Sequence, residues 1–205
     1  MLTIYGKLPS INVRKVVWTC AEIGIPFALE EWGAGFRPTS EPGFLAMNPN
    51  GMVPVIRDGD LVLWESNTIC RYLAGRHGRS DLLPADLARR ALVEQWMDWQ
   101  GGDFNNSWRY AFLALVRRHT DHTDPRAIAA GVEGWNRHMA ILNAQLEKTG
   151  PYVAGNDFTL ADIVLGLSVH RWLRSPIDRP GLAAVADYYS RLRQRESFLP
   201  LQEHV

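Results

Sequence analysis

The stretch that decides the fold is residues 48–67, which read NPNGMVPVIRDGDLVLWESN. Two short apolar runs, 53–56 and 61–64, lie on either side of Asp58-Gly59, a dipeptide typical of a tight hairpin turn. The pattern predicts an antiparallel hairpin. The polar residues that follow directly are typical of a helix start, so we expect a helix immediately after the hairpin.

A strand, a helix and a second strand are predicted upstream of this hairpin. Residues 2–5 and 27–30 are short strand-like runs, and 13–23 between them carry apolar residues at helical spacing up to Gly24, a typical helix end. The helix makes a crossover long enough for the two strands to be parallel. The order β-α-β-(α)-β-β-α predicts a thioredoxin-like α/β domain over residues 1–77.

From residue 86 onward the sequence predicts helices without strands. Apolar residues at helical spacing cover four stretches: 87–118, 124–148, 159–173 and 181–195. The pair Gly101-Gly102 is expected to bend or weaken the first of them. The expected fold class is α/β + all-α, a thioredoxin-like N-terminal domain followed by an all-helical C-terminal domain over residues 86–205.

Composition excludes several classes of function. The 205 residues hold 22 Lys+Arg and 22 Asp+Glu, so no net charge draws the protein to nucleic acid or to an anionic membrane. No apolar run is long enough to span a bilayer, and no basic segment at the start indicates a signal peptide. Cys20 and Cys70 lie in apolar helical contexts, typical of free buried thiols, and no metal-site spacing is present. We expect a cytoplasmic protein without a metal.

The dipeptide Val53-Pro54 is unusual because proline removes a donor from a strand that must pair. One resolution is a cis peptide bond, which would turn the N–H and C=O of Val53 outward to pair with an extended peptide. The other is a trans proline on an edge strand. The local sequence leaves both open.

Two helix starts carry side chains suited to binding. At Glu65-Ser66, helix N–H groups and a hydroxyl can hold a carboxylate while the Glu holds an ammonium group, which together suit an α-amino acid end. Ser10 can donate to a bound thiolate and lower a thiol pKa from about 8.5 toward neutral. Simple helix capping is the alternative at both places, and for Ser10 the two roles are compatible.

Aromatic residues gather in the first predicted helix of the C-terminal domain. Phe104, Trp108 and Phe112 share one helical face and either line a pocket or pack in the core. The neighbouring Arg109 either meets an anionic group, of a substrate or of a bound peptide's C-terminal carboxylate, or is a solvated surface charge. The pair His119 and His122 is better explained by a solvated loop than by a metal site.

Four segments, in this order, carry a family resemblance: SINVRKV at 10–16, NPNGMVPV at 48–55, LWESNTICRYL at 63–73 and GNDFTLADI at 155–163. They resemble the cytosolic glutathione S-transferase superfamily, with a bacterial, serine-type active site. The last segment looks like that family's capping motif, with Thr159 as N-cap and Asp162 reaching back to it.

The resemblance implies a role for each matching residue. Ser10 would be the activating hydroxyl. Val53, before Pro54, would pair its backbone with the cysteinyl part of glutathione, and Glu65 and Ser66 would hold the γ-glutamyl end.

The sequence departs from the family at two of its positions. Met52 stands where many members have Lys or Arg, so the backbone of Met52, or Arg37 or Lys7, would meet the glycyl carboxylate. Asn12 stands where many serine-type members have Pro, and its amide is a second candidate donor to the sulfur.

The resemblance implies a homodimeric glutathione transferase that conjugates the glutathione thiolate to small apolar electrophiles, with glutathione as its only co-substrate. Leu8, Phe104, Trp108, Arg109 and Phe112 would form the electrophile pocket. The alternatives are another glutathione-dependent enzyme (a peroxidase, dehalogenase or isomerase) and a non-catalytic binding protein of the same fold.

Overall fold

The computed structural model describes residues 1–204 and divides into two compact units. The α/β unit comprises Met1–Pro84 together with Glu196–His204, and the helical unit comprises Ala85–Arg195. The sequence analysis placed everything after residue 86 in the helical domain. For Glu196–His204 this is a correction, because the segment buries apolar side chains within the α/β unit.

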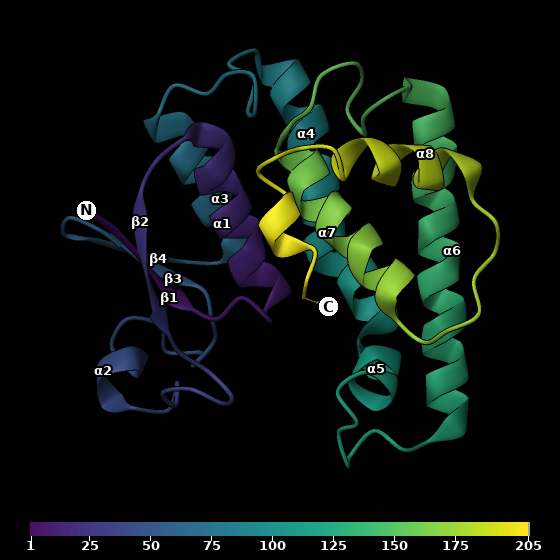
Figure 1. Cartoon of the computed structure of the whole chain (residues 1–205), viewed down its shortest axis with the longest axis horizontal. Helices are drawn as coiled ribbons and strands as arrows, with labels where there is room; N and C mark the ends of the chain where they lie inside the picture. The colour runs from purple at the N-terminus through teal and green to yellow at the C-terminus, as the bar shows by residue number, and fades with distance from the viewer. Residues whose placement is uncertain (205) are drawn as a thin grey trace. The chain divides into compact units, whose positions relative to one another are not determined.

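The α/β unit is built on a mixed four-stranded sheet of order β2-β1-β3-β4 (Figure 1). Its strands are β1 Leu2–Gly6, β2 Phe27–Glu31, β3 Val55–Asp58 and β4 Leu61–Trp64. Strand β1 pairs parallel with β2 and antiparallel with β3, and β3 and β4 form the antiparallel hairpin. The predicted thioredoxin-like topology is confirmed.

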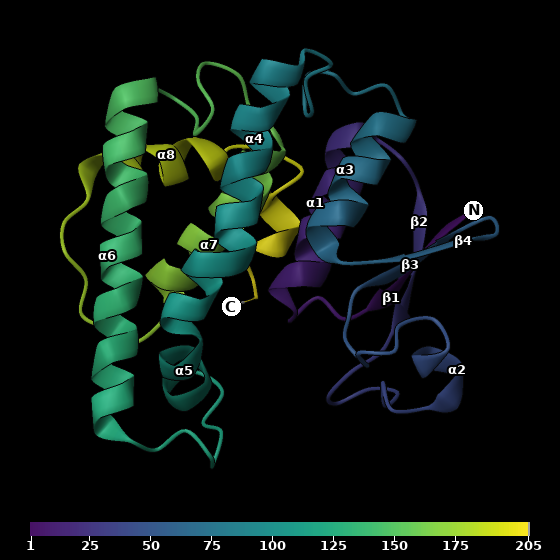
Figure 2. The ribbon, with the colours of Figure 1, turned by 180° about the vertical axis from the view of Figure 1, so that it is seen from behind.

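Helices cover both faces of this sheet. Helices α1 (Ile11–Ile23) and α3 (Ser66–Arg76) lie side by side on one face, and the short α2 (Pro42–Leu45) lies beyond the other (Figure 2). Helix α1 ends at Gly24, whose φ of 81° is the left-handed conformation that glycine favours and whose N–H donates to the Cys20 carbonyl.

The helical unit packs its helices around α7. Its elements are α4 Leu87–Trp99, a π-helical turn Gln100–Phe104, α5 Asn105–Leu115, α6 Pro125–Thr149, α7 Leu160–Arg174 and α8 Ala183–Leu192. The π turn lies where Gly101-Gly102 was expected to disturb the first helix. Helix α7 is buried nearly all round and starts with the predicted capping box of Thr159 and Asp162. Within residues 1–204, no helix is long and apolar enough to cross a membrane.

Candidate functional site

Ser10 is the N-cap residue of α1, at the end of the turn that leaves β1. Its backbone is extended, with φ −81° and ψ 120°, its N–H donates to the Lys7 carbonyl at 3.0 Å and its carbonyl accepts from the Arg14 N–H at 3.0 Å. The side chain makes no capping hydrogen bond. The Ser10 side chain therefore has no capping role in the structure, and the residue lies beside the N–H groups and the positive dipole end of the first helical turn.

Asn12 presents a second unused polar group in that turn. Its Oδ1 atom is buried and has no hydrogen-bond partner in the described part of the chain. A half-turn of the terminal amide exchanges oxygen and nitrogen, so this position can offer either an acceptor or an N–H donor. An unsatisfied buried polar atom is uncommon in a folded protein, and here it lies two residues from the candidate thiolate donor.

The Val53-Pro54 peptide bond is cis, which answers the question that the sequence left open. Strand pairing of β3 begins only at Val55, and no hydrogen bond among residues 1–204 involves the N–H or C=O of Val53. Half-buried Val53 thus carries an unused donor and acceptor of the kind that an extended peptide pairs with.

The loop before Val53 is held by Asn48, a residue that the sequence analysis did not single out. Its side chain is buried, its Nδ2 donates to the Met52 carbonyl at 2.8 Å and its Oδ1 accepts from the Asn50 N–H at 3.1 Å. The carbonyl of Met52 is therefore committed to the loop. The side chain of Met52 is exposed.

Glu65 has a backbone φ of 71°, a conformation that is sterically costly for a residue with a Cβ. It forms the N-cap of α3, but its side chain makes no capping hydrogen bond. Ser66 is 6% exposed and begins the helix. The structure therefore shows no helix capping by the Glu65 side chain. A residue held in a costly backbone conformation at the start of a helix is typical of a binding site.

Arg37 and Lys7, the two cations expected to meet the glycyl carboxylate, both contact other residues of the α/β unit. The Arg37 guanidinium lies 3.9 Å from the ring centre of Trp32 and pairs with Glu41 at 3.3 Å, while Lys7 Nζ donates to the Ala34 carbonyl. Beneath Arg37, the indole N–H of Trp32 is buried without an acceptor. An exposed cation above an unsatisfied donor is chemically suited to a carboxylate.

In the helical unit, the aromatic residues predicted for an electrophile pocket are buried. Phe104 is fully buried, with its ring centre 5.1 Å from that of Trp99 and 6.0 Å from that of His138. Trp108 is 5% exposed and stacks on Trp135 at 5.0 Å. This burial is what core packing produces.

The remaining predicted pocket residues differ in exposure. Phe112 is 5% exposed and has the guanidinium of Arg171 4.2 Å from its ring centre. Arg109 is exposed, and Leu8, in the turn between β1 and α1, is half-buried. Arg109 and Leu8 are thus the accessible members of the predicted set.

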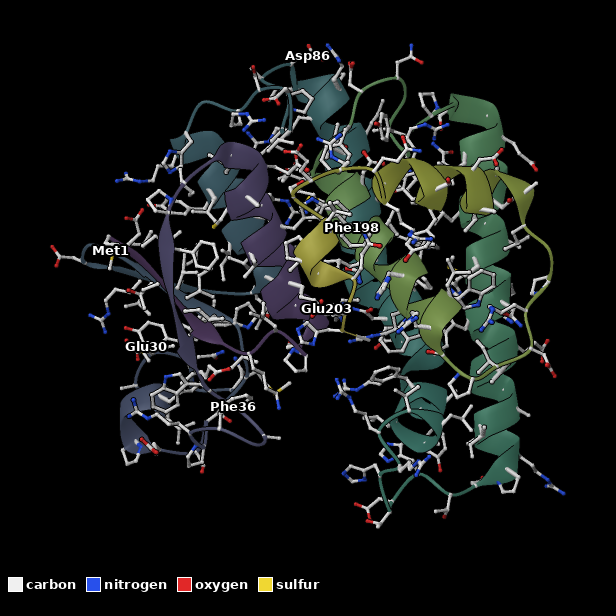
Figure 3. The ribbon with its side chains drawn as sticks, in the orientation of Figure 1. Met1, Glu30, Phe36, Asp86, Phe198 and Glu203 are labelled. Atoms are coloured by element: carbon white, nitrogen blue, oxygen red, sulfur yellow. The ribbon has the colours of Figure 1, made fainter. Side chains whose placement is uncertain are left out.

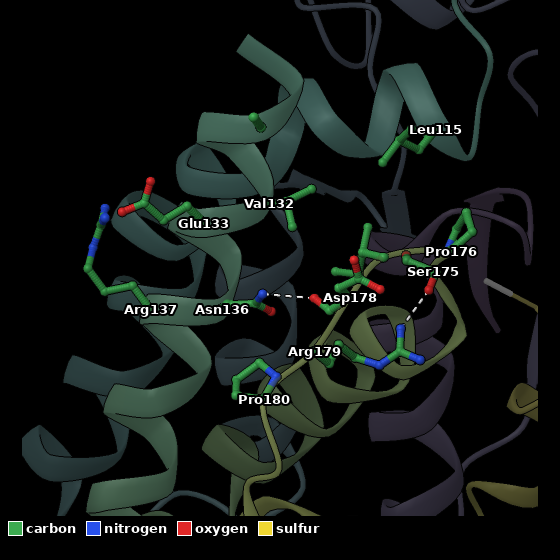
Figure 4. A pocket seen from close by; sticks show the side chains of 12 residues that line it. Leu115, Val132, Glu133, Asn136, Arg137, Ser175, Pro176, Asp178, Arg179 and Pro180 are labelled. Carbon is green, nitrogen blue, oxygen red and sulfur yellow. Dashed lines mark hydrogen bonds between the residues drawn. The ribbon is translucent and has the colours of Figure 1, made fainter. Parts of the chain in front are cut away.

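The surface of the helical unit also has an open pocket of about 1010 Å³ (Figure 4). One side is formed by α6 and the other by residues 175–180, where the Asn136 amide donates to the Asp178 carbonyl at 2.9 Å and Arg179 donates to the Ser175 carbonyl at 2.6 Å. None of the predicted electrophile-pocket residues lines it. No cluster of three or more His, Cys, Asp or Glu side chains suited to a metal occurs in the residues that the structure describes.

Known proteins resemble this chain along most of its length. The family "Glutathione S-transferase, N-terminal domain" matches residues 9–76. Glutathione S-transferase GstB of Escherichia coli (strain K12) is 36% identical over 203 residues, which cover 90% of this chain and 97% of that protein. The theta class glutathione S-transferase of Xanthomonas axonopodis pv. citri, solved with glutathione bound, is 38% identical, with a TM-score of 0.93 over 100% of this chain and 98% of that one.

A relative with a different name is more distant. The disulfide-bond oxidoreductase YfcG of Escherichia coli (strain K12) is 28% identical over 206 residues, which cover 95% of this chain and 91% of that protein.

Proposed function

This chain belongs to the glutathione S-transferase family, and from that premise we propose that it joins the sulfur of glutathione to small apolar electrophiles. The observation that carries the proposal is the Ser10 hydroxyl, which makes no capping hydrogen bond at the N-terminus of α1. A hydroxyl donor and a helix dipole at one point favour the anionic form of a thiol placed there.

The proposed reaction begins with ionisation of the bound thiol. The proton leaves to solvent, and the Ser10 hydroxyl donates a hydrogen bond to the resulting thiolate. The sulfur then attacks an electrophilic carbon, forming a carbon–sulfur bond while the leaving group departs with its electron pair. Lowering the thiol pKa by about two units corresponds to about 2.7 kcal/mol of stabilisation.

The same unit supplies contacts for the rest of the tripeptide. The unpaired N–H and C=O of Val53 are proposed to pair with the cysteinyl backbone. Glu65 would hold the α-ammonium group, and Ser66 with the first N–H groups of α3 would hold the α-carboxylate. Arg37, with the unsatisfied indole N–H of Trp32 beneath it, is proposed to receive the glycyl carboxylate.

Asn12 is the alternative donor to the sulfur, because its buried amide is also unused. For the electrophile, the proposal keeps Leu8 and Arg109, the accessible members of the predicted set, with the buried Phe104, Trp108 and Phe112 as a packed layer in the helical unit. We propose that the protein works as a cytoplasmic homodimer with glutathione as its only co-substrate.

Glutathione-dependent disulfide reduction is a second candidate, favoured by the relative named as a disulfide-bond oxidoreductase. The two cysteines of this chain are not suited to carry out disulfide reduction themselves. Burial raises the pKa of Cys20 to about 12 and that of Cys70 to about 11, so both are protonated at neutral pH. Any such activity would have to use the glutathione thiolate at Ser10.

Calorimetric titration with glutathione, followed by turnover of a chloronitrobenzene and of a small-molecule disulfide, tests the proposal. We expect glutathione binding and conjugation of the chloronitrobenzene. Binding with turnover of the disulfide alone would favour the second candidate. Binding without any turnover would indicate a binding protein, and absence of binding would overturn the proposal.

A further inference from the structure

The C-terminal segment Glu196–His204 is part of the α/β unit, although it follows the last residue of the helical unit directly. Phe198 is fully buried and Leu201 is 2% exposed, so the segment is packed and not merely adjacent. Figure 3 shows Phe198 and Glu203 on this segment beside α1. The sequence analysis gave the segment no place in the glutathione-binding unit.

The contacts run in order along α1, from its C-terminal half toward its start. Ser197 accepts from the indole N–H of Trp18 at 3.1 Å, and the Phe198 ring stacks on Trp18 with centres 4.3 Å apart and planes at 16°. One turn nearer the helix start, Arg14 Nη1 donates to the carbonyls of Leu201 at 3.2 Å and His204 at 2.6 Å. Three hydrogen bonds and one ring stacking therefore join the segment to one helix.

The residues of α1 that make these contacts lie on one face of the helix, in line with Ser10, the candidate catalytic residue. Trp18 and Arg14 are four residues apart, and Ser10 is the next position at that spacing. The backbone N–H of Arg14 donates to the Ser10 carbonyl at 3.0 Å. The residue whose side chain holds the C-terminal segment is thus the residue whose amide fixes the N-cap.

Arg14 needs these carbonyls, because its side chain is fully buried. A buried guanidinium is costly unless acceptors meet its N–H groups, and in the described part of the chain Nε and Nη2 of Arg14 have no hydrogen-bond acceptor. The C-terminal segment supplies two acceptors, both to Nη1. Removing the Arg14 side chain removes this contact, so the first turn of α1 loses an anchor next to its N-cap.

We propose that Arg14 is a positioning residue for the glutathione reaction: by binding the C-terminal segment, it holds the first turn of α1 so that Ser10 meets the sulfur. This inference rests on the proposed function. Because a displacement of about 1 Å at a reacting group can lower a rate by up to about a hundredfold, a loosened turn costs activity without any loss of a ligand contact.

The test compares the variant Arg14→Met with Arg14→Lys, which restores a cation, and with a control in the other unit. Arg191→Met is that control, since Arg191 Nη1 donates to the Pro151 carbonyl at 2.8 Å within the helical unit. For each protein, the pKa of bound glutathione is read from thiolate ultraviolet absorbance, and kcat and KM are measured with a chloronitrobenzene. In Arg14→Met we expect the pKa of the bound thiol to rise by about one unit, with KM for glutathione nearly unchanged. At pH values below that pKa, kcat should fall about tenfold. Arg14→Lys should recover most of the loss, and Arg191→Met should match the parent.

The inference would be overturned if folded Arg14→Met had the same thiol pKa and kcat as the parent protein. It would also be overturned if Arg191→Met lost as much activity as Arg14→Met. If Arg14→Met does not fold, a chain ending at Gln202 removes the His204 carbonyl and keeps Phe198 and Leu201. That chain should show the same change to a smaller degree, and a parent pKa in it would refute the positioning role. Failure of the parent protein itself to bind glutathione would instead refute the proposed function.

Discussion

Replacing Ser10 with alanine separates a catalytic serine from a helix cap. A serine that caps a helix contributes about 0.5–2 kcal/mol to stability. The Ser10 side chain makes no capping hydrogen bond, so we expect Ser10→Ala to change the free energy of unfolding by less than about 0.5 kcal/mol. A hydrogen bond to a charged group is worth about 1.5–3 kcal/mol, which corresponds to about one to two units of thiol pKa and to a rate loss of about 10- to 150-fold.

The assay is a pH profile of kcat/KM for glutathione conjugation, with urea unfolding of the same preparations. Because the variant loses a donor to the thiolate, its profile should move to higher pH, so the deficit should be largest near pH 6.5 and shrink toward pH 9. Asn12→Ala is the matched comparison and should move the profile less. A clear loss of stability with an unchanged profile would show that Ser10 is only a cap, and a larger shift in Asn12→Ala would make the amide the main donor.

Three further outcomes follow from individual contacts. Ser66→Ala should weaken glutathione binding about tenfold in calorimetry while kcat at saturating glutathione holds, because a hydrogen bond to a carboxylate is lost; unchanged affinity would misplace the γ-glutamyl end. Phe198→Ala should cost about 3–5 kcal/mol in urea unfolding, whereas Leu199→Ala, 54% exposed in the same segment, should cost little; equal losses would refute the packing. Burial raises the pKa of the Asp162 carboxyl from 3.8 to about 6, so the folded chain binds this proton more tightly than the unfolded chain. The resulting contribution to the free energy of unfolding is about 3 kcal/mol. It is fully present below pH 4 and is lost as the pH rises past 6. Asp162→Asn should lack that decline when both proteins are unfolded by urea across this pH range.

Local patterns were enough to predict the order of elements in both units. The hairpin followed from Asp58-Gly59 between two apolar runs, and the end of α1 followed from Gly24, because turn chemistry and apolar spacing act over a few residues. The glycine pair at 101–102 marked the place where the structure has a π-helical turn.

The features that the sequence did not reveal depend on distant contacts or on backbone angles. The return of Phe198 to Trp18 joins residues about as far apart as the chain allows, and no local pattern encodes it. The positive φ of Glu65 could not be predicted, because glutamate rarely adopts that conformation. Asn48 was not singled out from the sequence, because its role depends on burial and on the Met52 carbonyl that it binds.

The most direct test of the account is an ultraviolet titration of the parent protein with glutathione, using S-methylglutathione as the control that has no thiol to ionise. If Ser10 and the start of α1 stabilise the thiolate, mercaptide absorbance should appear with a midpoint about two units below the ordinary thiol value of about 8.5. A midpoint at the ordinary value, with glutathione demonstrably bound, would contradict the central claim.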